Sequence, residues 1–592
     1  MSTLDIIMPV FAQAEAVEVV ANVVAVTAER FSSVDTIWVL FGTALVFFMQ
    51  AGFTMVEAGF TRAKNTGNII MKNMMDFSLG AIFYWFIGFG LMFGTTSAYT
   101  GWIDIGVQRD YSFLDLTFPV PAFLIFQTVF CATAATIVAG AMAERTKFST
   151  YCLYSVVISG LIYPVSGHWI WGGGWLAERG FHDFAGSTAV HLVGGIAAFI
   201  GAAILGPRIG KYSVDGKPKA ILGSNLAMGA LGVFILWFSW FGFNGASTVS
   251  ATGDDSLMAM GTIFVTTNLA AAVASATTMI VTWIRYGKPD VSMTLNGALA
   301  GLVGVTAGCD AVSPVGAAVI GVICGTVLVF AVEFIDKVLR VDDPVGAVAV
   351  HGVCGALGTI LVGLLSLEEG LIYGHGAKLL TVQCIGVTAV IAWVSLAMIT
   401  MFGLLQATVG IRCCATDEIN GLDMAEHGLA SSYADFMPAT AQFGITPHVV
   451  PPSEAVPVEF RQPLPAVPKP HDPNNPKMTK VVIIFRQEKF EEFKAAMSRI
   501  TITGMTVSQV MGCGMQKGGK EFYRGIPIDI QLQPRVRVEI VICKVPLEVV
   551  VDTAMRILYT GNIGDGKIFV YDVENVIKIR TGEEGYDALQ DE

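Results

Sequence analysis

This sequence contains few charged residues. Only 14% of its 592 residues are Asp, Glu, Lys or Arg, whereas 53% are hydrophobic. This balance argues against a purely soluble protein and is typical of a chain that crosses a membrane many times. The 64 glycines favour the same interpretation, because small residues allow membrane helices to approach one another closely.

Clustered basic residues and closely paired cysteines are also missing. The net charge is -12, and the basic residues are scattered through short loops and the tail, which argues against a nucleic-acid partner. The ten cysteines show no CxxC spacing, so we interpret them as small packing residues rather than disulfides. His351 and Cys354 share one helical face, but the sequence offers no further ligands near them, which disfavours a metal site.

Eleven apolar stretches each have the length that a membrane-spanning helix needs. The expected spans are 35–60, 67–95, 118–142, 147–170, 185–206, 222–244, 257–284, 291–308, 314–335, 345–366 and 377–410. The sequence therefore predicts an all-α polytopic membrane domain over residues 34–410.

Lys and Arg are concentrated in alternate loops between these spans. The basic loops carry Arg62, Lys64, Arg145, Lys147, Arg208, Lys211, Lys217, Lys219, Arg285, Lys288, Lys337 and Arg340. The opposite loops carry only Arg109 and Arg179, with Lys378 at the edge of the last span. By the positive-inside rule the basic loops face the cytoplasm, so the N-terminus is expected outside and the C-terminal part inside. We expect a multi-pass protein of the cytoplasmic (inner) membrane.

One short pattern occurs twice, as Asp183-Phe-Ala-Gly-Ser-Thr-Ala-Val-His191 and as Asp343-Pro-Val-Gly-Ala-Val-Ala-Val-His351. His191 falls in the fifth span and His351 in the tenth, so the two copies cross the membrane in opposite directions. This is a 5+5 inverted repeat, whose site is expected near the midplane where the halves meet. An ionisable side chain in hydrocarbon is costly, so both histidines are candidate functional residues.

The repeat contains two further pairs of residues. A glycine follows each histidine four residues later, Gly195 and Gly355. Asp183 and Asp343 each lie near the start of a helix, where an aspartate can be a structural N-cap as well as a source of negative potential. The other ionisable residues expected inside spans, which we interpret as caps or as partners within the bundle, are Glu57, Lys72, Asp76 and Glu333.

Outside the spans the composition changes three times. Residues 1–33 have a faintly signal-like apolar stretch with no preceding Lys or Arg, and their removal is left open. Residues 411–437 read as a cytoplasmic segment of mixed charge. Residues 438–477 contain eleven prolines and are interpreted as an extended linker.

The last part of the chain, residues 478–592, has the alternation of a soluble α+β domain. Strands are expected at 481–485, 506–510, 536–543 and 567–571, and helices at 487–500 and 547–559. The order βαββαβ is that of a ferredoxin-like fold. A long polar loop, 513–534, lies between the two middle strands and is expected to be functional or disordered.

Longer motifs in the membrane part point to a known family. They are Ala143-Glu-Arg145, Trp171-Gly-Gly-Gly174, Trp240-Phe-Gly-Phe-Asn244, Asp342-Asp-Pro344, His351-Gly-Val-Cys-Gly355 and the first repeat copy. Together they resemble the ammonium transporter (Amt/Rh) family through all eleven spans. The resemblance implies a homotrimer with an ammonium-conducting pore in each subunit.

The resemblance also implies roles for individual residues. Ammonium recruitment at the outer mouth would fall to Trp171, Ser247, Phe130 and Asp183. The pore gate would be formed by Phe126, Phe130 and Phe243, and the twin histidines of the pore by His191 and His351. Aromatic faces attract a cation, and a neutral imidazole has one donor and one acceptor nitrogen, so this series suits a cation that can lose a proton.

Motifs in the C-terminal part resemble a second family. Thr503-Gly-Met-Thr506, Tyr523-Arg-Gly525, Thr560-Gly-Asn-Ile-Gly-Asp-Gly-Lys567 and Ile579-Arg-Thr-Gly-Glu583 are similar to PII nitrogen-regulatory proteins. In the glycine-rich stretch, Gly561, Gly564 and Gly566 allow the backbone to turn around an anion, and Lys567 supplies charge.

The PII resemblance implies effector sites. ATP or ADP would be bound by Gly512, Gly514, Gln516, Arg535, Glu539, Thr560, Gly564, Asp565, Gly566, Lys567, Lys578 and Arg580. The 2-oxoglutarate site would use Gln516, Gly518, Arg535 and Lys567, with Gln516 contacting magnesium through Mg-ATP only. Arg524 would be the pore-plugging residue, by which the domain docks on its own transporter or competes with a separate PII protein.

Three positions depart from the PII pattern. Ile528 and Ile526 stand where relatives carry a modified tyrosine and serine, so neither covalent switch is available. Met515 stands where an arginine is expected beside the nucleotide phosphates, which weakens the case for a preference for ATP and for 2-oxoglutarate coupling.

The leading functional hypothesis is an ammonium transporter gated by a fused nucleotide-sensing domain. The alternative is an ammonium sensor that conducts little and signals through its PII domain. An enzyme is not expected, because the sequence has no arranged general base and no NTPase-type P-loop.

Overall fold

The computed structural model describes residues 31–95, 97–213, 215–429, 478–502, 504–512, 520–523, 526–529, 533–561 and 564–589. The chain divides into two compact units, Met1–Cys414 and Ala415–Glu592. The N-terminal segment up to residue 30, the end of the expected mixed-charge segment (430–437) and the whole expected linker (438–477) lie outside the described residues.

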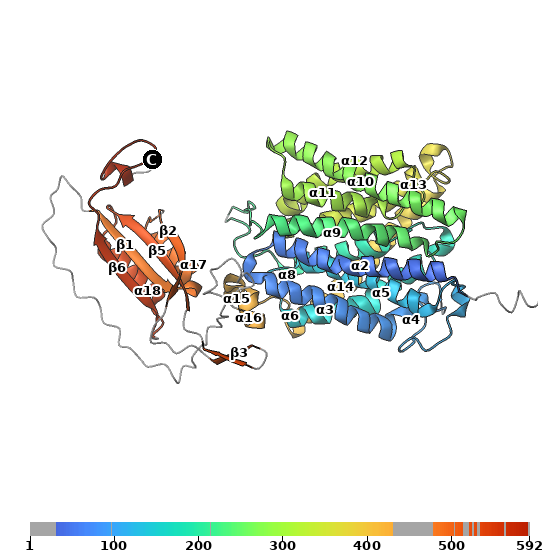
Figure 1. The fold of residues 1–592 in the computed structure, drawn as a ribbon, viewed down its shortest axis with the longest axis horizontal. Coiled ribbons are helices and arrows are strands. Elements are labelled where there is room, and N and C mark those ends of the chain that lie inside the picture. The colour runs from blue at the N-terminus through green and yellow to red at the C-terminus, as the bar shows by residue number, and fades with distance from the viewer. Residues whose placement is uncertain are drawn as a thin grey trace, which may run out of the picture. The chain divides into compact units, whose positions relative to one another are not determined.

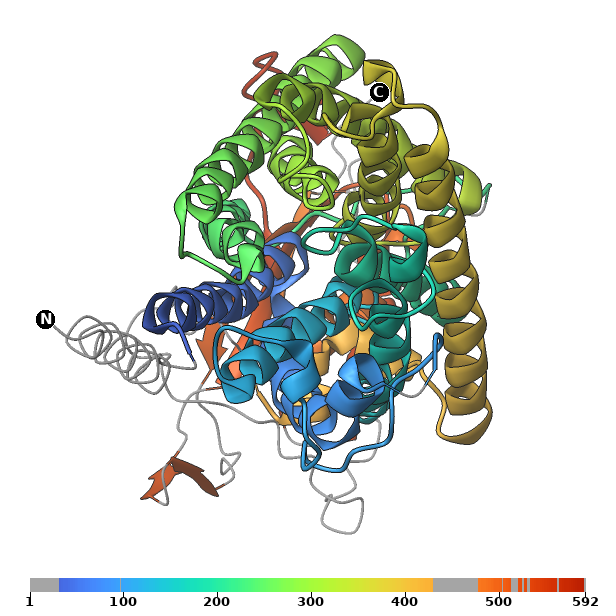
Figure 2. The same cartoon turned by 90° about the vertical axis from the view of Figure 1, so that its right-hand side faces the viewer.

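The first unit is a bundle of long helices (Figures 1 and 2). Its helices are α2 (Ser33–Phe60), α3 (Thr66–Phe83), α4 (Phe89–Phe93), α5 (Val120–Ala141), α6 (Phe148–Val157), α7 (Tyr163–Ile170), α8 (Val193–Leu205), α9 (Leu226–Gly245), α10 (Asp254–Tyr286), α11 (Val291–Val305), α12 (Pro314–Phe334), α13 (Cys354–Leu365) and α14 (Lys378–Thr408). Wide π-helical turns interrupt or extend several of them, at Tyr84–Gly88, Ile158–Ile162, Ser187–Leu192, Ile335–Leu339 and Val348–Val353.

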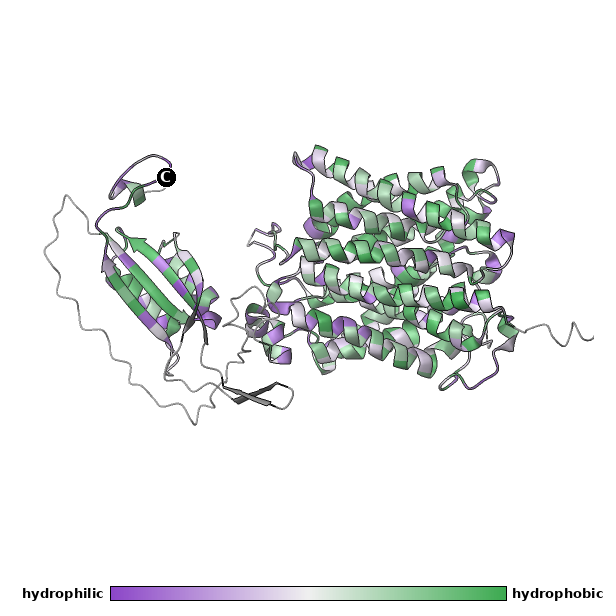
Figure 3. Cartoon of the chain, in the orientation of Figure 1, coloured by the Kyte–Doolittle hydropathy of each residue, from purple (hydrophilic) through white to green (hydrophobic). Residues whose placement is uncertain are grey.

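Ten helical segments among the described residues are long and apolar enough to cross a membrane, and the shorter apolar helix α11 is the eleventh. Figure 3 shows the hydrophobic colouring that runs along these helices. They coincide with the expected spans to within a few residues at each end, which confirms the polytopic helical fold class.

Polar caps and glycines explain how these helices begin and pack. Ser32 and Asn225 accept backbone N–H groups at the first turns of α2 and α9. The two helices then lie so close that a Cβ on Gly59 would come 2.5 Å from the nitrogen of Gly229. Such small-residue contacts replace the hydrophobic driving force that is missing between helices in lipid.

The second unit contains two short helices, α15 (Ala415–Asn420) and α16 (Leu422–His427), followed by a sheet domain. The domain comprises β1 (Thr479–Arg486), α17 (Phe490–Arg499), β2 (Thr506–Gly512), β3 (Lys520–Tyr523), β4 (Ile526–Asp529), β5 (Gln533–Ile542), α18 (Leu547–Leu558) and β6 (Gly566–Asp572). Four antiparallel strands form a sheet in the order β2-β5-β1-β6, which confirms the ferredoxin-like fold class.

One face of this sheet is covered by the two helices. Val481, Ile483 and Phe485 of β1 point to that face and pack with Phe493 of α17 and Val550 of α18. In the expected loop 513–534, the structure places a hairpin, β3–β4, and begins β5 at Gln533. The expected loop therefore contains a hairpin and the start of β5, and its expected functional role stays a prediction.

Candidate functional site

The two copies of the sequence repeat form the same local structure. The Asp183 carboxylate accepts the backbone N–H groups of Gly186, Thr188 and Ala189 at 2.8–3.0 Å. The Asp343 carboxylate accepts those of Val345, Gly346 and Val348 at 2.8–3.2 Å. Both aspartates are therefore helix caps, and each orients the π-helical turn that carries a histidine.

A left-handed glycine makes this cap geometry possible in each copy. Gly186 has φ +111° and Gly346 has φ +84°, values that residues with a Cβ rarely adopt. Asp183 itself lies outside the spanning helices. Burial raises the pKa of its carboxyl group, although three backbone hydrogen bonds act in the opposite direction.

The glycines that follow the histidines bring the two copies together. A Cβ on Gly195 would come 2.1 Å from the nitrogen of Gly352, and one on Gly355 would come 2.6 Å from the carbonyl oxygen of Ser187. Each copy thus packs against the backbone of the other. As a consequence Nδ1 of His191 lies 3.2 Å from Nδ1 of His351, and both rings are buried.

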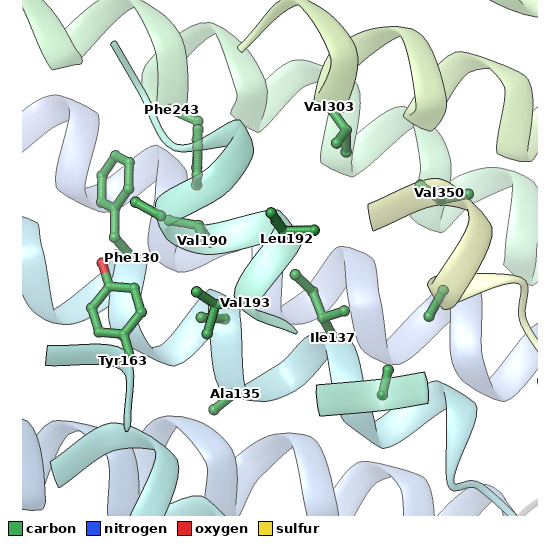
Figure 4. Close-up of a cluster of buried hydrophobic side chains, with 14 of the residues drawn as sticks. Phe130, Ala135, Ile137, Tyr163, Val190, Leu192, Val193, Phe243, Val303 and Val350 are labelled. Carbon is green, nitrogen blue, oxygen red and sulfur yellow. The ribbon is translucent and has the colours of Figure 1, made fainter. Parts of the chain in front are cut away.

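A series of aromatic rings leads to the histidine pair. Trp171 is half-buried, and its ring centroid lies 6.1 Å from that of Phe130. Phe130 and Phe243 are 4.3 Å apart, and Phe243 is 5.3 Å from His191. Figure 4 shows Phe130 and Phe243 near Val190, Leu192 and Val193, the apolar neighbours of His191 in the sequence.

The remaining predicted pore residues lie around this series. Phe126 meets Phe130 edge-on with centroids 4.8 Å apart, and it is buried. The Trp171 indole N–H donates to the carbonyl oxygen of Asp183, and the Ser247 hydroxyl donates to that of Phe243. The structure therefore brings the expected mouth, gate and histidine residues into one connected set.

Trp240 belongs to the same set, although sequence reasoning assigned it no role. Its ring lies over His191 with centroids 5.0 Å apart and an angle of 20° between the ring planes. Its indole N–H donates to the hydroxyl of Thr306 at 2.9 Å. The sequence signal for Trp240 was its position in the Trp240-Phe-Gly-Phe243 motif, which also contains the predicted gate residue Phe243.

A buried ion cluster holds the loops at one end of the bundle. Arg208 donates to both carboxylate oxygens of Asp342 at 2.8 and 2.9 Å and to Glu144 at 2.9 Å, and Glu144 also pairs with Arg62. Burial opposes ionisation of Asp342, but the hydrogen bonds from Arg208 and the charges of Arg145 and Arg208 hold its pKa at about 2. Burial lowers the pKa of Arg145 to about 10. Sequence alone could not identify Arg208, because basic residues in such loops are common.

In the second unit, the glycine-rich stretch forms a tight turn before β6. Gly561, Gly564 and Gly566 all have positive φ, and a Cβ on Gly566 would come 2.1 Å from the carbonyl oxygen of Ile484. Arg535 donates to the carbonyl oxygen of Gly564. Burial lowers the pKa of the Arg535 guanidinium.

A pocket of about 460 Å³ opens beside this turn. Asp565, Gly566 and Lys567 line its polar end, and Met555 and Leu558 of α18 contribute apolar wall. That volume is in the usual range for small-molecule sites, about 300–1,000 Å³. The pocket therefore combines a basic residue and exposed backbone with apolar surface.

Other predicted effector residues are found in different settings. Thr560 donates to Asp565, and Gly512 ends β2. Glu539 forms ion pairs with Lys480 and Arg537, and these oppose the burial that would raise its pKa, so the pKa is lowered. Lys578 lies 3.7 Å from Glu583 in the segment after β6, which also carries Arg580. Gly514, Gln516, Gly518 and Arg524 lie outside the described residues.

Comparisons with known proteins match both parts of the chain. The profile of the Ammonium Transporter Family matches residues 37–432, and that of Nitrogen regulatory protein P-II matches residues 478–583. The chain is 45% identical to ammonium transporter Amt2 of Archaeoglobus fulgidus, over 68% of this chain and 89% of that protein. It is 38% identical to ammonium transporter 1 member 4 of Arabidopsis thaliana, over 64% of this chain and 81% of that protein.

Solved structures give the same result. A structure named Sensor Amt Protein aligns with a TM-score of 0.62 and 37% identity, over 67% of this chain and 98% of that one. Candida albicans Mep2 aligns with a TM-score of 0.62 and 28% identity, over 71% of this chain and 95% of that one. The protein is thus a multi-pass membrane transporter rather than an enzyme. The chain belongs to the ammonium transporter family and carries a P-II nitrogen regulatory domain after its transporter part.

Proposed function

We propose that each subunit takes up ammonium at Trp171 and conducts it as ammonia plus a proton through the histidine pair. The observation that carries this proposal is the 3.2 Å contact between the Nδ1 atoms of His191 and His351, buried at the end of an aromatic series. A cation is attracted by the faces of Trp171 and Phe130, while Ser247 offers a hydroxyl oxygen to its N–H groups.

The buried phenylalanines then favour the uncharged species. Phe130 and Phe243 are both no more than 1% exposed, so a hydrated cation cannot pass between them without losing water. Nε2 of His191 is buried and has no hydrogen-bond partner, which makes it available to the arriving substrate. A proton received there moves along the Nδ1 contact to His351, while ammonia follows the apolar wall.

The nucleotide site of the P-II domain is the proposed regulator. ATP or ADP, with magnesium, binds in the pocket beside Asp565, Gly566 and Lys567, and its apolar wall accepts the base. The positive φ values at Gly564 and Gly566 support a phosphate-binding turn. The residues proposed to complete the nucleotide site are Gly512, Gly514, Gln516, Arg535, Glu539, Thr560, Lys578 and Arg580, and those for 2-oxoglutarate are Gln516, Gly518, Arg535 and Lys567.

A homotrimer with a docking loop would couple the two parts. Phe569 and Tyr571 lie on the sheet face opposite the helices and are 39% and 52% exposed, so a neighbouring subunit can cover them.

The distribution of basic loops supports an inner-membrane protein with its P-II domain in the cytoplasm. The loop that carries Arg524 would then plug the pore exit. Because position 528 is isoleucine, nucleotide rather than covalent modification sets the state of this loop.

Solid-supported-membrane electrophysiology tests the regulation. Ammonium-evoked current should change when ADP or ATP is added on the P-II side, and deletion of residues 478–592 should remove that change. Lys567→Ala should weaken the nucleotide response, whereas Lys494→Ala, at an exposed position of α17, should keep it. A nucleotide response that survives the deletion would contradict the assignment.

A second candidate function is an ammonium sensor, favoured by the likeness to the structure named Sensor Amt Protein. A sensor needs ammonium binding at the mouth but little current. Tight ammonium binding together with an absence of current in the wild-type protein would therefore favour the sensor.

A further inference from the structure

A small internal cavity adjoins the histidine pair. Its volume is about 20 Å³, and His351, Glu57 and Asn296 line it together with apolar side chains such as Ala347. A cavity of roughly 10–15 Å³ is large enough to hold one water molecule. Because Nδ1 of His351 faces His191, Nε2 is the nitrogen left to exchange a proton with such a water.

Glu57 is the ionisable carboxylate of this cavity. It lies in α2, three residues before the helix ends at Phe60, and is 3% exposed. Its Oε2 accepts a hydrogen bond from the neutral amide of Asn73 at 3.0 Å. The backbone of Gly140 packs against it so closely that a Cβ there would lie 3.4 Å from its Cγ. A carboxyl group in this position is costly and is expected to serve a function.

Two charged residues of α3, Lys72 and Asp76, extend the polar region around Glu57. Lys72 is fully buried, its amine has no hydrogen-bond partner, and it lies 5.3 Å from the ring centroid of Tyr151. Asp76, one turn further, accepts hydrogen bonds from Tyr151 and Ser155. Within the bundle the Lys72 amine therefore contacts an aromatic ring and has no hydrogen-bond partner, whereas Glu333 forms ion pairs with Arg285 and Lys337. A buried amine without a partner is a place where water is stabilised.

We propose that Glu57 is the proton acceptor on the exit side of the histidine pair. The N–H bond at Nε2 of His351 breaks, and its electron pair stays on the ring nitrogen. A proton forms an O–H bond on the cavity water, and that water gives another of its protons to the Glu57 carboxylate. Glu57 then releases the proton toward the nearby end of α2 and returns to the carboxylate. This step rests on the proposed conduction of ammonia plus a proton.

Apart from His351, Glu57 is the side chain lining this cavity that can take up and release a proton. Asn296 carries an amide that does not hold a proton at neutral pH, and its Nδ2 already donates to the carbonyl oxygen of Val345 at 2.9 Å. The other lining side chains, apart from the histidine itself, are apolar. In the orientation expected from the basic loops, the end of α2 faces the cytoplasm, so the remaining path is short.

Glu57→Gln separates proton exit from ammonia passage, because glutamine still offers an oxygen to Asn73 but holds no proton. In proteoliposomes, the ammonium-evoked current should fall at least tenfold. Ammonia passage should continue without its proton, and a pH dye inside the vesicles should report alkalinisation above that of protein-free liposomes. Glu57→Asp should restore part of the current. Glu333→Gln, near the end of α12 and outside this cavity, is the control and should carry wild-type current.

An unchanged current in Glu57→Gln, with wild-type current present, would overturn the assignment of Glu57 and leave the proposed transport function intact. Absence of current in the wild type would instead overturn the transport function. If Glu57→Gln does not insert as a folded protein, Ala347→Val decides the matter, since it fills the cavity and leaves Glu57 in place. Wild-type current in Ala347→Val would overturn the relay.

Discussion

At the scale of single residues, Asp342 combines burial with a fixed charge. Its carboxylate receives two hydrogen bonds from the Arg208 side chain and one from the Arg208 backbone, and its side chain is 1% exposed. Removal of the carboxylate leaves Arg208 with Glu144 as its acidic partner in this cluster. A buried cation that loses part of its compensation is strongly destabilising.

The pKa of Asp342 gives a prediction for acid stability. Because the folded-state pKa is about 2 and the ordinary value is 3.8, ionised Asp342 stabilises the fold above about pH 4, and this stabilisation is lost as the pH falls toward 2. The shift corresponds to about 2–3 kcal/mol. We expect Asp342→Asn to lower the unfolding free energy by at least that amount at pH 7 and to flatten the loss between pH 4 and pH 2.

Thermal unfolding of the detergent-solubilised protein, followed by tryptophan fluorescence across this pH range, measures the effect. Glu368→Gln, at an exposed position, is the control and should leave the profile unchanged. An equally steep acid transition in wild type and Asp342→Asn would show that other groups determine it.

At the scale of elements, the contact between the two histidines depends on how closely two helical segments approach. Gly195 allows the backbone that carries His191 to lie against Gly352, directly after His351. A side chain at this position would push the two π-helical turns apart, and the 3.2 Å contact between the imidazoles would lengthen. The activity proposed for the pair would thus depend on a glycine that has no reactive side chain.

Gly195→Ala is therefore expected to reduce the ammonium-evoked current strongly and to lower the unfolding free energy by about 1–3 kcal/mol through overpacking. Gly261→Ala is the matched control, because Gly261 lies in helix α10 and a Cβ added there would meet no atom within 4 Å. If both substitutions leave current and stability at wild-type values, close packing of the two copies is not required.

Much of this architecture follows from the sequence. Long apolar runs predict spans because they are long enough to cross the bilayer. The short continuous apolar run 481–485 predicts a buried strand. The offset between His191 and His351 across five spans places them in opposite helices, and the structure has them in contact.

Other features depend on tertiary contacts that no local pattern encodes. The π-helical turns before α8 and α13 arise where the caps of Asp183 and Asp343 fix the first N–H groups. The β3–β4 hairpin pairs Lys520–Tyr523 with Ile526–Asp529 inside the stretch that we interpreted as a loop. The sequence could not show that the buried amine of Lys72 contacts the Tyr151 ring and has no hydrogen-bond partner.

At the scale of the whole molecule, transport and regulation are divided between two units of one chain. The proposed conduction path lies within Met1–Cys414 and the proposed nucleotide pocket within Ala415–Glu592. In the proposed docking, the chain between the two units would raise the effective concentration of the P-II domain toward roughly the millimolar range, so that even a weak interface could be occupied. Both activities can be measured in the same reconstituted preparation.

In the proposed mechanism, the buried imidazole pair carries the proton of ammonium. The most direct test of this mechanism is the ammonium-evoked current of purified protein in proteoliposomes, compared between wild type and the double variant His191→Leu with His351→Leu. We predict a current in the wild type that is lost, or altered in its selectivity between ammonium and potassium, in the double variant. A double variant with the wild-type current and selectivity would contradict this account.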